Sequence, residues 1–172
     1  MNQGLRVAGV VFVAALLQVT IVSSLDVFGG TADLLLVTLV SIGLIRGSVV
    51  GAAAGFGGGL LVDAATLGTL GANALLLTIA GYWAGRYGET TGRDRGHAPL
   101  LAVGVITIGF AVAGFALYFM LGEDVSARHA LFDTLLPALV LNLALTLPVH
   151  AVCRALIPGS DAPRAREVEF GV

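Results

Sequence analysis

The sequence predicts an all-α protein, a polytopic integral membrane bundle of six transmembrane helices. The 172 residues are 57% hydrophobic and only 12% charged, whereas a soluble domain carries about 25% charged residues. The mean hydropathy is +0.96. The chain also divides into six apolar segments joined by short polar connections: 6–24, 31–45, 47–62, 67–85, 98–121 and 131–153.

Segment lengths identify the first, fourth, fifth and sixth segments as spans, because a spanning helix needs about 20 apolar residues. Segments 31–45 and 47–62 are shorter, and only Arg46-Gly47 interrupts them. We expect a tight helical hairpin with Arg46 at a cytoplasmic turn. A re-entrant hairpin from the outer face is the alternative. It would place Arg46 at membrane depth, where burying an arginine costs at least about 2.5–3.5 kcal/mol.

The basic residues predict the orientation. Six spans put both chain ends on the same side as the connections near residues 46 and 86–97. That side carries eight of the nine basic residues: Arg6, Arg46, Arg86, Arg93, Arg95, Arg154, Arg164 and Arg166. Basic residues in short loops favour the cytoplasmic side, so we expect a multi-pass protein with both termini cytoplasmic.

The chain is expected to form one transmembrane domain, residues 1–155, followed by a short cytoplasmic tail, residues 156–172. Two prolines and mixed charge in that tail predict disorder. The first apolar segment also has features of a secretory signal peptide. Cleavage near residues 22–24 would leave five spans and move the new N-terminus outside.

Glycine recurs at every fourth position along segment 47–62, at Gly47, Gly51, Gly55 and Gly59. In lipid, helices associate through close backbone approach, which small residues permit. We therefore predict a helix-packing surface or a partner interface, and Gly81 and Gly85 repeat the spacing once in segment 67–85. The run GFGGG is not a phosphate-binding loop, because no Lys-Ser/Thr pair follows it.

Two carboxylates are expected at the outer rim of the bundle, where they could border a pocket. Asp33 opens segment 31–45 and is suited to capping a helix N-terminus. Asp63 ends the glycine run. It either lies in interfacial water or is held under the outer loops by backbone amides or by Arg128. Without a third ligand, a cation site is not expected.

A polar stripe, Asn142, Thr146 and His150, follows the last segment at a spacing of four, so these side chains share one helix face. Polar groups in lipid face other helices or a cavity, and bonds between helices contribute about 0.6 kcal/mol on average. His150 could titrate near neutral pH, but no carboxylate lies at its depth to form a proton relay. The spans also lack a zinc-protease motif, a nucleophile triad and paired carboxylates, so we expect no enzyme activity, cofactor, metal or nucleic-acid partner.

Residues 32–86 carry an ordered set of motifs: Asp33-Leu34-Leu35, Gly43-Leu44-Ile45-Arg46-Gly47, Gly59-Leu60-Leu61-Val62-Asp63, and Gly81-Tyr82 followed by Arg86. This pattern resembles the MreD family of bacterial rod shape-determining proteins. Length and six-span layout extend the resemblance over about residues 5–155. Ala32 departs from the pattern, because the family often has proline before the opening aspartate.

The resemblance implies a non-enzymatic scaffold of the cell-elongation complex in the bacterial inner membrane. Its implied direct partner is MreC, through the single transmembrane helix and the periplasmic domain of that protein. An actin-like filament and a polymerase–transpeptidase pair that builds peptidoglycan are indirect partners, and membrane lipids surround the bundle. On this view the glycines pack helices or dock the MreC helix.

The MreD family is also distantly similar to the substrate-binding subunits of energy-coupling-factor vitamin transporters. That similarity implies an alternative function: a subunit that binds a small, vitamin-like molecule for a membrane transporter. It favours six compact helices with an outward-facing pocket near Asp63.

Overall fold

The computed structural model describes residues 3–20, 31–67, 69–91, 97–122 and 135–157. The described part of the chain is all-helical and contains no strand, which confirms the predicted class. Its helices are α1 (Gln3–Thr20), α2 (Leu34–Arg46), α3 (Ser48–Thr66), α4 (Ala72–Thr91), α5 (Ala98–Met120) and α6 (Leu135–Leu156). Arg128 and residues 158–172 of the expected tail lie outside the described residues, as do the signal-peptide cleavage positions.

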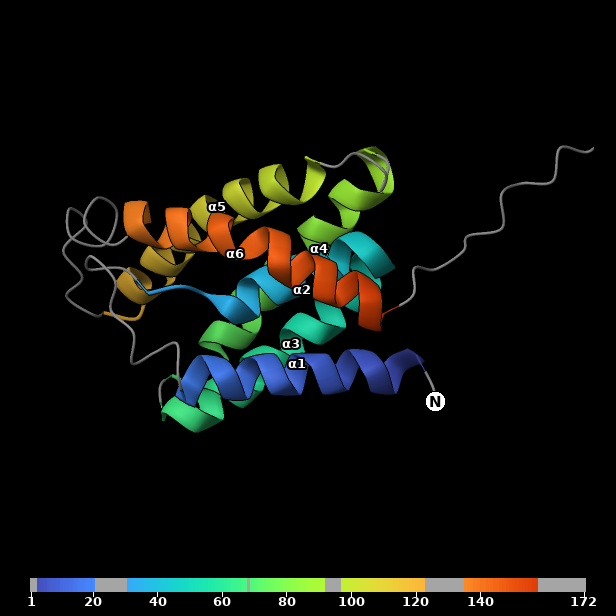
Figure 1. Cartoon of the computed structure of the whole chain (residues 1–172). Coiled ribbons are helices and arrows are strands. Elements are labelled where there is room, and N and C mark those ends of the chain that lie inside the picture. The colour runs from blue at the N-terminus through green and yellow to red at the C-terminus, as the bar shows by residue number, and fades with distance from the viewer. Residues whose placement is uncertain (1–2, 21–30, 68, 92–96, 123–134, 158–172) are drawn as a thin grey trace, which may run out of the picture.

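The helices run alternately in opposite directions between two ends of the bundle. At one end, the Arg46 side chain donates a hydrogen bond to Gln3, so the α2–α3 turn lies beside the start of α1. At the other end, the Leu34 N–H donates to Gln18 Oε1 at 2.8 Å, so α2 begins beside the last turn of α1. The start of α1 and the end of α6 lie at the same end, on the right in Figure 1.

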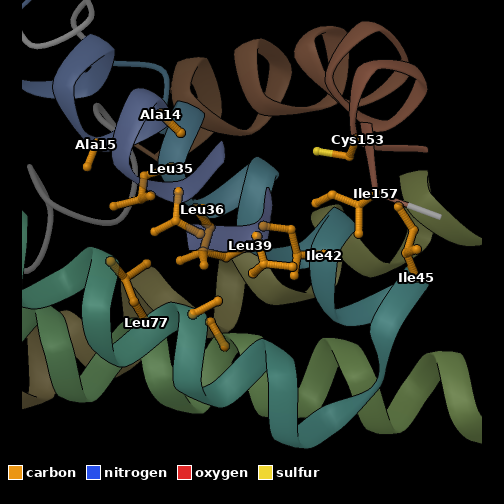
Figure 2. Packing of buried hydrophobic residues seen from close by; sticks show 14 residues of the cluster. Ala14, Ala15, Leu35, Leu36, Leu39, Ile42, Ile45, Leu77, Cys153 and Ile157 are labelled. Atoms are coloured by element: carbon orange, nitrogen blue, oxygen red, sulfur yellow. The ribbon is translucent and has the colours of Figure 1, made fainter. Parts of the chain in front are cut away.

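Helix α2 forms the centre of the bundle. Its residues 35–45 are all buried, and α2 contacts each of the other five helices. A helix that is apolar on every side is expected in an interior. Figure 2 shows its leucines packed among Ala14 of α1, Leu77 of α4 and Cys153 of α6. The 13 residues of α2 span only about 20 Å, and the other five helices surround this short helix.

Two of the length expectations are wrong. Among the described residues, the helices long and apolar enough to cross a membrane are α1, α3, α5 and α6. Segment 47–62 was expected to be short, but α3 continues through Thr66 and reaches 19 residues. Segment 67–85 was expected to qualify, but α4 begins only at Ala72 and continues into a polar stretch.

The boundary between α3 and α4 differs from the predicted one because the chain turns there through two left-handed residues. Leu67 has φ 53° and Gly71 has φ 93°, and left-handed backbone ends a helix. An apolar sequence therefore continues across a turn that hydropathy does not reveal.

Gly47 alone separates α2 from α3. Its φ of 95° and ψ of 176° lie in a region that side chains with a Cβ rarely adopt. The sequence placed Gly47 at the head of the helical glycine row, whereas the structure places it in the turn before that row.

Candidate functional site

Helices α3 and α4 approach each other backbone to backbone along a row of glycines. A Cβ added at Gly55 would lie 2.6 Å from the carbonyl carbon of Leu77, and one at Gly59 would lie 2.6 Å from the backbone N of Ala74. Real Cβ atoms essentially never approach other atoms within 3.0 Å. Any side chain at these positions would therefore push the two helices apart.

The same relation holds from α4. A Cβ at Gly81 would lie 2.6 Å from the carbonyl carbon of Gly51, and one at Gly85 would collide with the backbone of Ser48. We call this contact the glycine seam, formed by Gly51, Gly55 and Gly59 of α3 with Gly81 and Gly85 of α4. The seam face of α3 is thus occupied by a helix of the same chain.

A further glycine that the sequence analysis left out of the row joins the seam from α2. A Cβ at Gly43 would lie 2.9 Å from the carbonyl oxygen of Gly81. Gly43 precedes Gly47 by four residues, so the same spacing extended backwards would have identified it. The glycine row was described within segment 47–62, and Gly43 belongs to segment 31–45.

Asp63 lies at one end of the seam and is fully buried. Its Oδ2 accepts hydrogen bonds from the N–H groups of Gly71 at 2.9 Å and Ala74 at 3.2 Å, and its Oδ1 accepts from Asn73 at 3.2 Å. These amides lie at the start of α4, where N–H groups lack helical acceptors and negative charge is favoured. Asp63 is therefore buried and bonded to backbone amides, and it does not lie in interfacial water.

Glu89 plays the matching role at the other end of the seam. Its Oε1 accepts hydrogen bonds from the Ser48 N–H at 2.8 Å and the Ser48 hydroxyl at 3.0 Å. Ser48 is the first residue of α3, so each helix of the pair supplies a carboxylate to the N-terminus of the other. Glu89 stands in the polar connection 86–97, so hydropathy does not reveal this role. The signal was its position four residues after Gly85, as Asp63 follows Gly59.

The capping of α3 by Glu89 predicts a pH dependence of stability. Glu89 lies beyond the apolar segment 67–85. The bond from the Ser48 N–H, followed by that from the Ser48 hydroxyl, holds the pKa of Glu89 below its ordinary value, and Arg86 contributes less. A lowered folded-state pKa gives stabilisation that is present above the unfolded-state pKa and is lost as pH falls through the folded-state pKa.

Glu89→Gln should therefore lower the Tm at neutral pH, and its deficit relative to wild type should vanish at acidic pH. Glutamine resembles the protonated acid, so the two proteins converge once Glu89 is neutral. Thermal unfolding in detergent, followed from neutral pH to a pH below the folded-state pKa of Glu89, measures this difference. Arg86→Gln keeps both Ser48 bonds and should retain most of the pH dependence. An equal Tm deficit for Glu89→Gln at every pH would contradict the assignment.

A second group of polar side chains surrounds the start of α2, and we call it the α2 N-terminal cluster: Gln18, Asp33, Thr107 and Asn142. Asp33 Oδ1 accepts from the Leu36 N–H at 2.8 Å and caps α2. Asn142 Oδ1 accepts from the Asp33 N–H at 2.7 Å, while its Nδ2 donates to Thr107 Oγ1 at 3.2 Å. The cluster therefore joins α2 to α1, α5 and α6.

The predicted polar stripe on α6 divides in the structure. Asn142 and Thr146 are buried, and the Thr146 hydroxyl donates to the Asn142 carbonyl of its own helix at 2.7 Å. His150 is only half-buried, and its Nδ1 has no hydrogen-bond partner among the described residues. Asp33 and Asp63 likewise serve different helices, α2 and α4.

The bond between Asn142 and Thr107 can be measured by a double-mutant cycle. We expect a coupling near 0.6 kcal/mol between Asn142→Ala and Thr107→Val, and at most about 1.7 kcal/mol. Reversible unfolding in mixed micelles gives the free energies. Val140→Ala, at an exposed position on α6 with 63% exposure, serves as a control that should show no coupling to Thr107→Val. A coupling of zero between Asn142→Ala and Thr107→Val would show that this hydrogen bond does not stabilise the packing of α6 against α5.

Comparison with known proteins gives one finding. A family model described as rod shape-determining protein MreD matches residues 2–156. No curated protein matches the chain, and no solved structure matches it. The matched range contains every helix described above, including the glycine seam and the α2 N-terminal cluster. Within the described residues, no group of three or more histidine, cysteine or acidic side chains could hold a metal ion.

Proposed function

The chain belongs to the MreD family of rod shape-determining proteins, and we propose that it is an inner-membrane scaffold of the cell-elongation complex that binds MreC. Family membership implies a role in rod shape determination, and MreD is not a known family of enzymes. Through MreC, the scaffold would help to control peptidoglycan synthesis by the polymerase–transpeptidase pair and would communicate with the actin-like filament.

One observation supports a scaffold above other roles. Every buried polar side chain among the described residues makes a hydrogen bond within the chain: Thr38, Ser41, Ser48, Asp63, Thr107, Asn142 and Thr146. Catalytic and ligand-binding sites hold polar groups that point toward a substrate. Here Ser48, Asp63, Thr107 and Asn142 bond to another helix or to its end. The hydroxyls of Thr38, Ser41 and Thr146 bond to carbonyls of their own helices. All seven groups are used within the chain, which supports a rigid binding partner.

We propose that all six helices cross the membrane and that both termini are cytoplasmic. The arginine bias supports this orientation, and Arg46 lies at the end of the bundle that holds the start of α1. The short α2 can cross because protein surrounds it on all sides, and a local thinning of the bilayer can absorb the remaining mismatch.

Binding of MreC would use a surface other than the glycine seam. The seam face of α3 is filled by α4, so it cannot receive a second helix while the fold is intact. The seam then contributes to MreC binding indirectly, by fixing the shape of the bundle that the MreC helix meets.

Depletion of the protein in its own host, with MreC isolated from the same membranes, tests this proposal. We expect cells to lose their rod shape as the protein disappears, and we expect tagged protein to co-purify with MreC from control cells. Rod shape that persists after depletion, together with reduced uptake of a small molecule, would instead support the transport function. That alternative also requires saturable, stoichiometric binding of a vitamin-like ligand to the purified chain.

A further inference from the structure

A groove of about 850 Å³ opens between α1 and α6, with α2 as its floor. The α1 wall extends from Leu5 to Leu17 and the α6 wall from Leu145 to Leu156. These walls make little direct contact with each other. The lining is almost entirely apolar, and the one charged side chain among the described lining residues is Arg6, which is exposed.

The groove is long enough to hold one acyl chain. Leu5 and Leu17 are about 18 Å apart along α1 at 1.5 Å per residue, and half of the hydrocarbon core is about 15 Å. At the end opposite Arg6 the groove stops beside the α2 N-terminal cluster, because Leu17 adjoins Gln18 and the lining residue Leu34 donates its N–H to that side chain.

We propose that this groove binds one anionic phospholipid, with its phosphate at Arg6 and an acyl chain lying along α1 and α6. The charge pattern fits such a molecule, because the cation lies at the mouth and none of the described residues that line the groove is acidic. Arg154 follows the lining residue Cys153 at the same end of the bundle and adds a second positive charge. A basic residue near the membrane surface favours anionic lipid by about 1 kcal/mol.

Native mass spectrometry of the full-length protein in detergent, with phosphatidylglycerol or phosphatidylcholine added, measures this binding. We expect one phosphatidylglycerol to be retained in preference to phosphatidylcholine. Arg6→Gln should weaken phosphatidylglycerol retention about fivefold. Gly9→Phe should abolish it, because Gly9 lines the groove and a Cβ there meets no atom within 4 Å, leaving the ring free to fill the space.

Matched controls come from surfaces outside the groove. Gly57→Phe adds the same ring at an equally open position on α3, and Arg86→Gln removes an exposed arginine from α4. Both controls should retain phosphatidylglycerol at the wild-type level. If Gly9→Phe fails to fold, Arg6→Gln and Arg86→Gln decide between the outcomes.

Three results would overturn the proposal. They are equal retention of the two lipids by wild type, unchanged retention in folded Gly9→Phe or Arg6→Gln, and equal loss in the control variants. A folded Gly9→Phe that keeps phosphatidylglycerol but no longer co-purifies with MreC would assign the groove to a protein helix instead. These measurements do not depend on the scaffold function, because lipid retention is read on the purified chain alone.

Discussion

Gly55→Leu is expected to prevent stable folding, whereas Gly57→Leu, the same change two residues away, is expected to leave the chain folded. A Cβ at Gly55 would meet backbone atoms of Leu77 and Thr78, which cannot rotate away, but one at Gly57 meets nothing within 4 Å. Overpacking costs about 1–3 kcal/mol and sometimes more. A collision with backbone belongs at the upper end of that range, because α3 and α4 must separate to relieve it.

The alanine variants sharpen this comparison, because the expected effects have opposite signs. Gly57→Ala should stabilise the helix or leave it unchanged, since alanine is favoured over glycine in a helix by about 1 kcal/mol. Gly55→Ala should lower the Tm, because even one methyl group does not fit the seam. Thermal unfolding and size-exclusion chromatography in detergent measure both effects. Equal Tm values for the two alanine variants would show that the seam is not closed.

Asp63→Ala is expected to destabilise the chain by more than about 3 kcal/mol, because it leaves the N–H groups of Gly71, Asn73 and Ala74 without an acceptor. Each buried polar group that loses its partner costs about 1–3 kcal/mol. Asp63→Asn should be intermediate, since its amide keeps one acceptor oxygen but turns an NH₂ group toward backbone donors.

Asp33→Ala is the matched control for Asp63→Ala. Asp33 also caps a helix, but its side chain accepts one backbone N–H, that of Leu36, so the loss should be about 1 kcal/mol. Unfolding free energies measure the difference, and hydrogen exchange should show faster exchange of the amides at the start of α4 in Asp63→Ala alone. If Asp63→Ala costs no more than Asp33→Ala, Asp63 does not organise the start of α4.

Much of the fold could be predicted from residue patterns because membrane helices leave strong signals. Low charge content and long apolar segments predicted the all-helical class, and the motifs of residues 32–86 predicted the family that the match to residues 2–156 confirms. The four-residue glycine spacing marked one face of α3. It could not say what covers that face, because a glycine row fits a helix of the same chain as well as a helix of a partner.

The remaining features depend on three-dimensional contacts that a linear pattern does not contain. The start of α4 was misplaced because Asp63 and two left-handed residues, rather than hydropathy, determine it. Glu89 was missed because it lies in a polar stretch that hydropathy assigns to a connection. The central position of α2 also follows from packing, since a short apolar segment can equally be a thin span or a core helix.

We propose that the glycine seam holds together a scaffold on which rod shape depends. Expression of Gly55→Leu or Gly57→Leu in host cells depleted of the wild-type protein tests it most directly, with cell shape scored by microscopy and membrane levels by immunoblot. We expect Gly57→Leu to restore rods and Gly55→Leu to leave cells round. Rods restored by Gly55→Leu at a normal membrane level would contradict it.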